Sequence, residues 1–165
     1  MADHESIRKL AAAVVNDMTD AGKALSTAES CTGGWVSKAL TDIPGSSAVF
    51  HYGVVSYSNG AKEHILGVQS ATIEKHGSVS EPVVEEMARG VLNLSGSDIA
   101  VAVSGIAGPD GGTEDKPVGT VWFAWAVRGG GKIRTETHQA HFDGDRELIR
   151  ELTVVHALQG VLDRL

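Results

Sequence analysis

Cysteine is almost absent from this chain of 165 residues, which holds a single one, Cys31. A lone cysteine forms no internal disulfide bond, so the fold must be stable without that crosslink. The hydrophobic content of 42% supports a packed core, and the length suits one domain spanning residues 1–165. Low cysteine usage also agrees with a reducing compartment, so we expect the protein in the cytoplasm.

Long apolar runs and excess positive charge are also missing. No stretch approaches the 18 consecutive apolar residues of a membrane-spanning helix, so we expect no membrane partner. The 14 Lys and Arg residues are outnumbered by 21 Asp and Glu, giving a net charge of -7 that repels a polyanion. Nucleic acid is therefore not expected as a partner, whereas a small phosphate ligand needs only a few local N–H groups and cations.

Metal-binding and nucleotide-cofactor signatures are lacking as well. The seven histidines include no His-x-x-x-His pair, and His138 and His141 should point to opposite faces of a strand, so we expect no metal. The glycine-rich loop from Gly105 to Gly112 has neither the Gly-Lys-Ser/Thr ending of a P-loop nor the spacing of a dinucleotide fingerprint. We therefore expect no cofactor.

Helical periodicity is clear in three segments. The first ends near Gly22, the second spans Glu81–Leu94, and the third starts at about Asp145. The apolar positions that define the first are Ile7, Leu10, Ala11, Val14, Val15 and Met18. In the third, the predicted apolar side consists of Leu148, Ile149, Leu152, Val155 and Leu162.

Strand-like segments alternate with these helices. They are the run before Thr27, then 48–57, 98–103, 118–127 and 133–142, and the last two are joined by a short glycine-rich turn typical of an antiparallel hairpin. This order predicts an α/β fold: a three-layer α/β/α sandwich with a mixed β-sheet. In such sheets ligands gather beyond the carboxyl ends of the strands.

The segment from Thr27 to Gly34 places Ser30 and Cys31 at a predicted strand-to-helix junction. A hydroxyl there has two interpretations, a helix cap or a nucleophile beside N–H groups that stabilise an oxyanion. Cys31 is an alternative nucleophile, because a thiolate at a helix N-terminus is activated, or else a small buried hydrophobic residue.

Three further groups carry candidate chemistry. Lys62 is the best candidate for a base that activates Ser30, if burial lowers its pKa, and is otherwise a solvated lysine at a helix start. The loop that follows Ser104 either cradles a phosphate or merely shapes a turn. Arg146 stands at a helix start, where a cation is unfavourable, so either an anionic ligand or a salt bridge with a nearby carboxylate is expected.

Taken together, these groups resemble the CinA C-terminal domain family, the nicotinamide-nucleotide amidases. The matching motifs cover nearly the whole chain: Ala28–Gly34, Pro44–Ser47, Tyr57-Ser58-Asn59 with Lys62, Leu66–Val68, Gly77–Ser80, Gly105–Pro109, Lys116–Val121 and Gly144–Arg146. One departure is Ser104, where the family often has threonine, and a hydroxyl is retained. The resemblance also implies that longer members carry an additional N-terminal domain, which we do not expect in this chain.

The resemblance implies a metal-free amidohydrolase that converts nicotinamide mononucleotide and water to nicotinate mononucleotide and ammonia, in pyridine-nucleotide recycling. It makes Ser30 the nucleophile, Lys62 its base, and Tyr57 a member of their proton network. The substrate-binding residues that we then expect are Cys31, Thr32, Gly33 and Gly34 around the oxyanion, with Ser104, Gly105, Gly108 and Arg146 toward the phosphate. The alternative is a nucleotide-binding or partner-binding module without significant turnover. The sequence leaves the oligomeric state open, and a symmetric homo-oligomer is expected if subunits associate.

Overall fold

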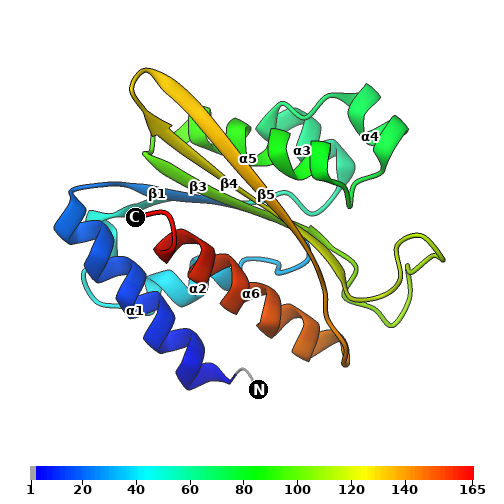
Figure 1. The fold of residues 1–165 in the computed structure, drawn as a ribbon, viewed down its shortest axis with the longest axis horizontal. Coiled ribbons are helices and arrows are strands. Elements are labelled where there is room, and N and C mark those ends of the chain that lie inside the picture. Colours follow the sequence, from blue (N-terminus) through cyan, green and yellow to red (C-terminus); the bar gives the residue numbers. More distant parts are fainter. Residues whose placement is uncertain (1–2) are drawn as a thin grey trace.

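The computed structural model describes residues 3–165, and Met1 and Ala2 of the predicted domain lie outside the described residues. One five-stranded sheet, in the order β2-β1-β3-β4-β5, separates two layers of helices (Figure 1). The sheet is mixed, since β1 pairs in parallel with β2 and β3 whereas β3, β4 and β5 pair antiparallel. The predicted three-layer α/β/α fold with a mixed sheet is thus confirmed.

The strands follow the predicted segments closely. They are β1 (Leu25–Glu29), β2 (Phe50–Val55), β3 (Ile99–Gly105), β4 (Thr120–Gly129) and β5 (Lys132–His141). The predicted hairpin joins β4 to β5, with Gly130 and Gly131 at positive φ in its turn. All residues of β1 are buried, because helices cover both faces of this central strand.

One layer of helices consists of α1 (His4–Ala21), α2 (Trp35–Thr41) and α6 (Arg146–Leu162), below the sheet in Figure 1. Apolar side chains from these helices and the lower sheet face form the larger core cluster, which includes Met18, Leu40, Phe123 and Leu158. A short 3-10 helix (Ser46–Ala48) leads from α2 into β2. As predicted, α1 ends at Gly22, which adopts the left-handed conformation (φ 64°) of a helix C-cap.

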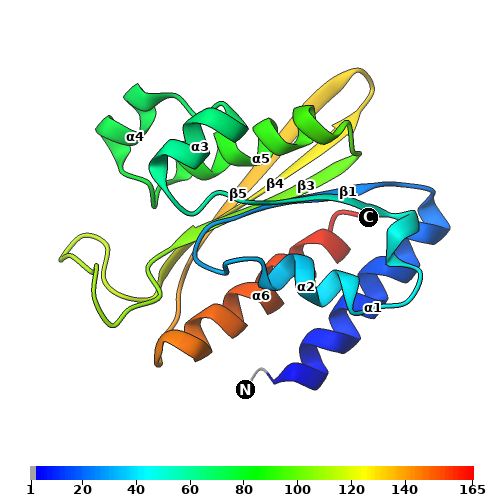
Figure 2. The same ribbon diagram turned by 180° about the vertical axis from the view of Figure 1, so that it is seen from behind.

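The other layer consists of α3 (Asn59–Leu66), α4 (Ser70–His76) and α5 (Glu81–Ser95), which Figure 2 shows from behind. The predicted helix over Glu81–Leu94 is α5, with Pro82 in its first turn. Its buried side chains include Val84, Met87 and Val91, which pack on the alanine-rich upper sheet face at Ala100, Ala102, Ala124 and Ala126. Small residues on the sheet let α5 approach closely.

The predicted apolar side of α6 is partly wrong. Ile149 is buried, but the other fully buried positions include Thr153, Ala157 and Gly160, which the apolar pattern did not contain. A Cβ atom at Gly160 would overlap the Trp125 ring, so the indole fits only because this residue has no side chain. The buried side of α6 therefore combines small residues with the large apolar residues Val154, Leu158 and Val161, none of which is in the predicted set.

Three parallel strands end at the same edge of the sheet, and this edge positions the site. Ser30 follows β1, Ser56 and Tyr57 follow β2, and β3 ends at Ser104 and Gly105. The helix α2 lies close under β1 and β2, since a Cβ atom at Gly53 would clash with the side chain of Ser37. The missing side chain of Gly53 thus allows the close approach of α2 to the sheet.

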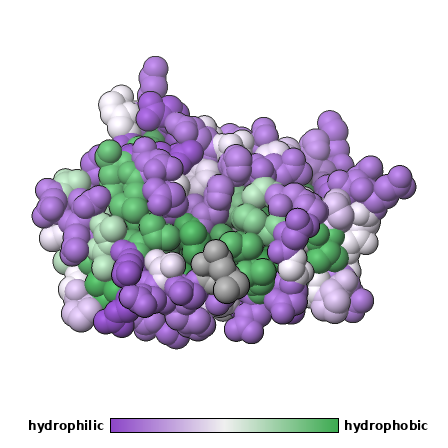
Figure 3. All heavy atoms as spheres, turned by 60° about the horizontal axis from the view of Figure 1, so that its bottom comes forward, coloured by the Kyte–Doolittle hydropathy of each residue, from purple (hydrophilic) through white to green (hydrophobic). Residues whose placement is uncertain are grey.

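The surface of the molecule is mixed in character. Seen from the side of α1 and α6, hydrophobic residues form patches bordered by hydrophilic ones (Figure 3). Among residues 3–165, the structure contains no helix with both the length and the apolar character required to span a bilayer.

Candidate active site

Ser30 lies at the carboxyl end of the central strand β1, where its main-chain N–H still donates to Val103 O on β3 (3.1 Å). Its hydroxyl faces Lys62 Nζ at 3.0 Å. The two residues are 32 positions apart in the sequence and come from different layers, because α3 brings Lys62 over the strand ends. The predicted nucleophile and base candidates are therefore hydrogen-bonded partners.

Lys62 is buried, with 1% of its surface exposed, although it lies in the first turns of α3. Besides Ser30, its Nζ contacts two main-chain carbonyl oxygens, Ser56 O at 2.8 Å and Tyr57 O at 3.2 Å. Burial lowers the pKa of the Lys62 ammonium from its ordinary value of 10.5, because the charged form loses its hydration. The interpretation of Lys62 as a solvated lysine is wrong.

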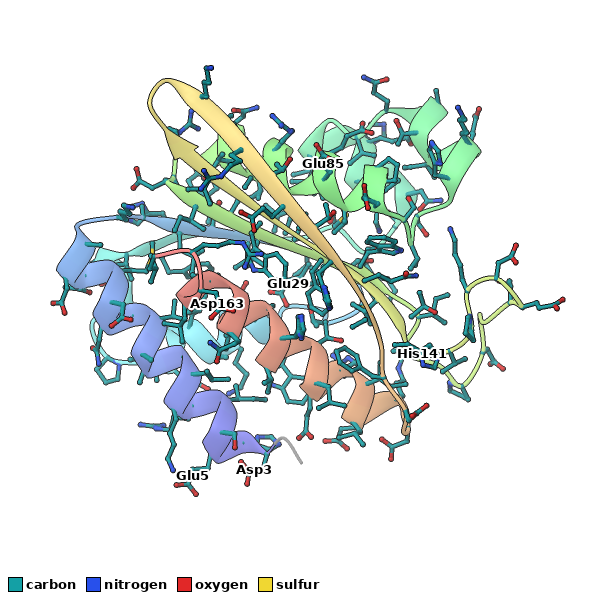
Figure 4. The ribbon with its side chains drawn as sticks, in the orientation of Figure 1. Asp3, Glu5, Glu29, Glu85, His141 and Asp163 are labelled. Carbon is teal, nitrogen blue, oxygen red and sulfur yellow. The ribbon has the colours of Figure 1, made fainter. Side chains whose placement is uncertain are left out.

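The cap of α2 is Glu29, not Ser30. The buried Glu29 carboxylate accepts hydrogen bonds from the N–H groups of Val36 (2.9 Å) and Ser37 (3.0 Å) and from the hydroxyls of Thr32 and Ser37. Figure 4 shows Glu29 near the centre of the molecule, between the sheet and the helices below it. Because a carboxylate from the strand satisfies the first N–H groups of α2, the hydroxyl of Ser30 is left to face the lysine.

Cys31, the alternative nucleophile, is buried in the larger core cluster. Burial, followed by the negative charge of Glu29, raises the pKa of its thiol to about 12. Hardly any thiolate forms near neutral pH at such a pKa. The geometry thus favours the small buried hydrophobic residue over the activated thiolate.

A pocket of about 280 Å³ opens over Ser30 and Lys62. This volume is near the lower end of the range for small-molecule sites. The predicted residues that line it are Ser30, Cys31, Tyr57, Lys62, Ser104, Gly105, Gly108 and Arg146, joined by Ser78, Val79, Ile106, Ala107, Asp110 and Gly111. Five separate chain segments therefore meet around one opening.

Arg146, at the start of α6, reaches the glycine-rich loop between β3 and β4. Its Nη1 donates to Gly108 O (2.7 Å) and its Nη2 to the hydroxyl of Tyr57 (3.2 Å). Within residues 3–165, no carboxylate lies within 4.0 Å of this guanidinium, so the predicted salt bridge is not formed. The positive charge of Arg146 is thus directed at the pocket.

Tyr57 contacts the dyad through its main chain rather than its phenol. Its carbonyl accepts a hydrogen bond from Lys62, whereas its side chain, 60% exposed, pairs with Arg146. The role of Tyr57 in the proton network, which the resemblance implies, stays a prediction.

Sequence reasoning missed the segment Gly77–Ser80 as part of the pocket wall. The Ser104 hydroxyl donates to Ser78 O (2.8 Å), which ties the end of β3 to this segment. At Gly108, with φ at 80°, a Cβ atom would overlap Val118, so only glycine fits this turn of the loop. The signal for Gly77–Ser80 was present only as a family motif, since turn residues carry no periodicity.

Thr32, Gly33 and Gly34 are not among the residues that line this pocket. They line a neighbouring hollow of about 400 Å³ together with Trp35 and Arg150. Thr32 is fully buried, and its hydroxyl donates to the carboxylate of Glu29. The geometry offers no contact between a substrate and the side chain of Thr32.

Arg150, which sequence reasoning did not single out, binds this turn from the hollow. Its Nε donates to Cys31 O and its Nη2 to Thr32 O, both at 3.1 Å. Its guanidinium also lies 5.5 Å from the centre of the Trp35 ring. Since Arg150 follows Arg146 by one helical turn, α6 contributes one arginine to the pocket and one to the turn behind it.

Some histidines lie beside other titratable side chains that are distant in the sequence. His138 and His156 stack with ring centroids 4.8 Å apart, away from the pocket. His4, Glu147 and Glu151 place one potential metal-ligand atom each within 4.8 Å of one another, on the outer side of α1 and α6. No linear motif joins these residues, and none of them lines the pocket.

The family model of the CinA C-terminal domain matches residues 7–165. The chain is 57% identical over 139 residues to nicotinamide-nucleotide amidohydrolase PncC of Escherichia coli, covering 84% of this chain and 82% of that protein. It is 53% identical over 138 residues to the protein of the same name from Pseudomonas putida, covering 84% of each.

A solved structure has the same fold. The competence damage-inducible protein A (ComA) from Klebsiella pneumoniae superposes with a TM-score of 0.90 at 43% identity, and the match covers 95% of both chains. With its family match, its relatives and its fold in agreement, the chain belongs to the CinA C-terminal domain family.

Proposed function

We propose that this protein is an amidohydrolase that converts nicotinamide mononucleotide and water to nicotinate mononucleotide and ammonia through an acyl-enzyme on Ser30. The observation that carries the proposal is the pair of Ser30 Oγ and buried Lys62 Nζ, 3.0 Å apart at the floor of a pocket. The choice of substrate is supported by the relatives named nicotinamide-nucleotide amidohydrolase, at 53% to 57% identity.

The surroundings of Lys62 suit both protonation states that the mechanism needs. The ammonium donates its three N–H bonds to Ser56 O, Tyr57 O and Ser30 Oγ. The neutral amine keeps the two carbonyl contacts and turns its lone pair toward the hydroxyl of Ser30, from which it accepts the proton. The lowered pKa of Lys62 makes the neutral amine more accessible than it is in an exposed lysine.

In the first step Ser30 Oγ attacks the carboxamide carbon while its proton passes to Lys62 Nζ. The resulting tetrahedral intermediate collapses by breaking the C–N bond, and the lysine ammonium protonates the leaving nitrogen to release ammonia. Water then transfers a proton to Lys62 and attacks the nicotinoyl ester carbon. Cleavage of the ester bond returns the proton to Ser30 and frees the nicotinate product.

The oxyanion of each intermediate needs hydrogen-bond donors. In the part of the chain that the structure describes, the N–H groups of Cys31 and Thr32 donate no hydrogen bond within the protein. We assign the oxyanion to the main-chain N–H of Cys31, which follows Ser30 and belongs to a residue that lines the pocket. Thr32 is fully buried outside this pocket and has no such role.

The phosphate of the nucleotide is assigned to Arg146 and the loop that follows Ser104. Within the described residues 3–165 no carboxylate pairs with Arg146, and its guanidinium binds Gly108 O, so it can hold an anion against the N–H groups of this loop. Tyr57 Oη fixes the other side of the guanidinium. Asp110 at the rim disfavours a second anionic group there.

The test is to incubate purified protein with nicotinamide mononucleotide and to measure ammonia and nicotinate mononucleotide. We expect stoichiometric formation of both, and no product with Ser30→Ala, which calorimetry should show to retain nucleotide binding. Binding by the wild-type protein without product would contradict the proposal and identify a nucleotide-binding module instead.

A further inference from the structure

His4, Glu147 and Glu151 form a cluster of potential metal ligands outside the pocket. His4 lies in the first turn of α1, and the two glutamates lie one turn apart near the start of α6. These helices pack against each other and begin at the same end of the molecule (Figure 1). One imidazole nitrogen and two carboxylate oxygens, one atom from each residue, lie within 4.8 Å of one another. Two segments far apart in the sequence therefore place three donor atoms around one point.

The two carboxylates of this cluster have no basic side chain to neutralise them. Across residues 3–165, no Lys or Arg nitrogen lies within 4.0 Å of either glutamate, and only His4 Nε2 approaches, at 3.6 Å from Glu151 Oε1. Because Glu147 and Glu151 are four positions apart on one face of the helix, their like charges repel each other. A cation between them would remove this repulsion.

The burial of Glu151 is the second observation that points to a ligand. Only 13% of its side chain is exposed. Among the side-chain hydrogen bonds of α1 and α6 in the described chain, none involves its carboxylate. The buried carboxylate of Glu29, by contrast, accepts four hydrogen bonds. Since a poorly hydrated carboxylate without donors is unfavourable, a bound cation would compensate for the donors that Glu151 lacks.

The types of donor atom select the class of cation. Ca²⁺ and Mg²⁺ prefer oxygen ligands, whereas an imidazole nitrogen with carboxylate oxygens suits Zn²⁺. With metal–ligand bonds of about 2.0–2.2 Å, the donors of a tetrahedral zinc site are about 3.3 Å apart. The side chain of His4 is 79% exposed, so its ring can turn inward from the present spacing without disturbing the core.

We propose that His4, Glu147 and Glu151 bind Zn²⁺ and that the ion fastens α1 to α6. Water would complete the four-coordinate shell, as in other zinc sites with three protein ligands. The ligands come together only in the folded chain, so the ion stabilises the folded state. None of the three residues lines the pocket over Ser30, and the ion therefore takes no part in the proposed amide hydrolysis.

Calorimetric titration with Zn²⁺ tests the site on purified, tag-free protein that has been freed of metal with a chelator. We expect one ion per chain. Glu147→Gln and Glu151→Gln keep the shape of each side chain and remove its charge, so each should weaken binding at least about tenfold, since loss of an outer-shell partner alone costs that much. His4→Ala should weaken binding to a similar extent.

His141→Ala is the matched control. His141 Nδ1 also faces a carboxylate, Asp143 Oδ1 at 4.0 Å, but within residues 3–165 this pair has no third ligand. Because the two places are independent, the affinity of His141→Ala for Zn²⁺ should stay within about twofold of wild type.

Thermal unfolding gives a second measure, the difference in Tm with and without the metal. At about 100 times its Kd, Zn²⁺ should raise the Tm of the wild-type protein by about 5–10 °C. The increase should be lost in Glu147→Gln at the same concentration of Zn²⁺ and retained in His141→Ala. Mg²⁺ at that concentration should leave the Tm of the wild-type protein unchanged.

Two results would overturn the inference. One is the absence of Zn²⁺ binding by the wild-type protein, and the other is binding that persists undiminished in both Glu147→Gln and Glu151→Gln. Either result leaves the proposed amidohydrolase activity intact, because the release of ammonia from nicotinamide mononucleotide is measured separately.

Discussion

Ser30 and Cys31 are neighbours in the sequence with opposite surroundings. The Ser30 hydroxyl faces Lys62 in the pocket, whereas the Cys31 thiol is packed in the core with its pKa raised to about 12. We expect Cys31→Ala to retain most of the activity of the wild-type protein, because a small residue replaces a small buried one. Steady-state turnover of nicotinamide mononucleotide measures this, with Ser30→Ala as the inactive reference. An active Ser30→Ala beside an inactive Cys31→Ala would reverse the assignment.

Lys62 gives the reaction a characteristic pH dependence. The proposed base acts in its neutral form, and burial lowers its pKa below the ordinary value of 10.5. The neutral fraction increases as pH rises through the folded-state pKa, so kcat should rise with pH and reach its plateau below the pH expected for an exposed lysine. Lys62→Met should be inactive at every pH. A flat profile for wild type would argue against a lysine base.

Some residues of the candidate site could be predicted from the sequence and others could not. Ser30, Lys62 and Arg146 were predicted as candidates, because nucleophilic and cationic side chains stand out from the background of their segments. The roles of Glu29 and Arg150 were not, since they act on main-chain groups of residues 7 or more than 100 positions away. Such contacts follow from tertiary packing and leave no local pattern.

At the scale of elements, the cap of α2 links strand β1 to the proposed site. Glu29 is buried, and its two carboxylate oxygens accept four hydrogen bonds. In Glu29→Gln an amide NH2 group replaces one acceptor and faces donors, so we expect the unfolding free energy to fall by about 1–3 kcal/mol. Urea unfolding followed by circular dichroism measures this loss.

Glu85 on α5 provides the matched control for that substitution. Its side chain is 37% exposed and accepts from the hydroxyl of Thr135, with Arg89 at 3.6 Å. Because solvent replaces these partners, Glu85→Gln should change the unfolding free energy by less than about 1 kcal/mol. An equal decrease of the unfolding free energy in the two variants would show that the hydrogen bonds of Glu29 stabilise the fold no more than those of the exposed Glu85.

The ends of helices and strands were predicted well where glycines interrupt the apolar pattern, as at Gly22 after α1 and at the glycines between β4 and β5. The side on which α6 packs was predicted less well. Gly160 faces the core because the Trp125 indole occupies the space where a Cβ atom would lie, and the buried Thr153 on the same side is polar. Polar or small residues do not contribute to an apolar stripe. Packing of this kind depends on the partner surface, which the helix sequence does not contain.

For the whole molecule, the contact between α6 and the sheet predicts a loss of stability in acid. His156 packs on Phe123 (ring centroids 4.6 Å apart) and on His138. Its pKa is lowered from 6.5 chiefly by burial, then by His138, with Asp163 and Arg164 acting in opposite directions. The unfolded chain therefore binds a proton more readily than the folded one.

This difference in pKa determines how stability changes with pH. The contribution of neutral His156 to stability is fully present above the unfolded-state pKa of 6.5 and is lost as pH falls through the lower folded-state pKa. We expect the unfolding free energy of the wild-type protein to decrease from pH 7.5 to pH 5, and His156→Phe to show a smaller decrease. Urea titrations at both pH values test this, and an equal decrease in the two proteins would contradict the assignment.

The layered architecture could be predicted from the order of helices and strands, but the strand order could not. Placement of β1 between β2 and β3 is what brings Ser30, Tyr57 and Ser104 to one edge. Periodicity identifies a buried strand without naming its neighbours. The sequence therefore indicated that a site forms at strand ends, and the structure specifies which ends meet.

The acceptors of Lys62 have an evolutionary consequence. Its two carbonyl contacts are main-chain atoms of Ser56 and Tyr57, which persist whatever side chains those positions carry. A change of side chain at either position therefore keeps both main-chain acceptors of the Lys62 amine in place. The fold thus separates the atoms that hold the amine from the side chains that evolution can exchange.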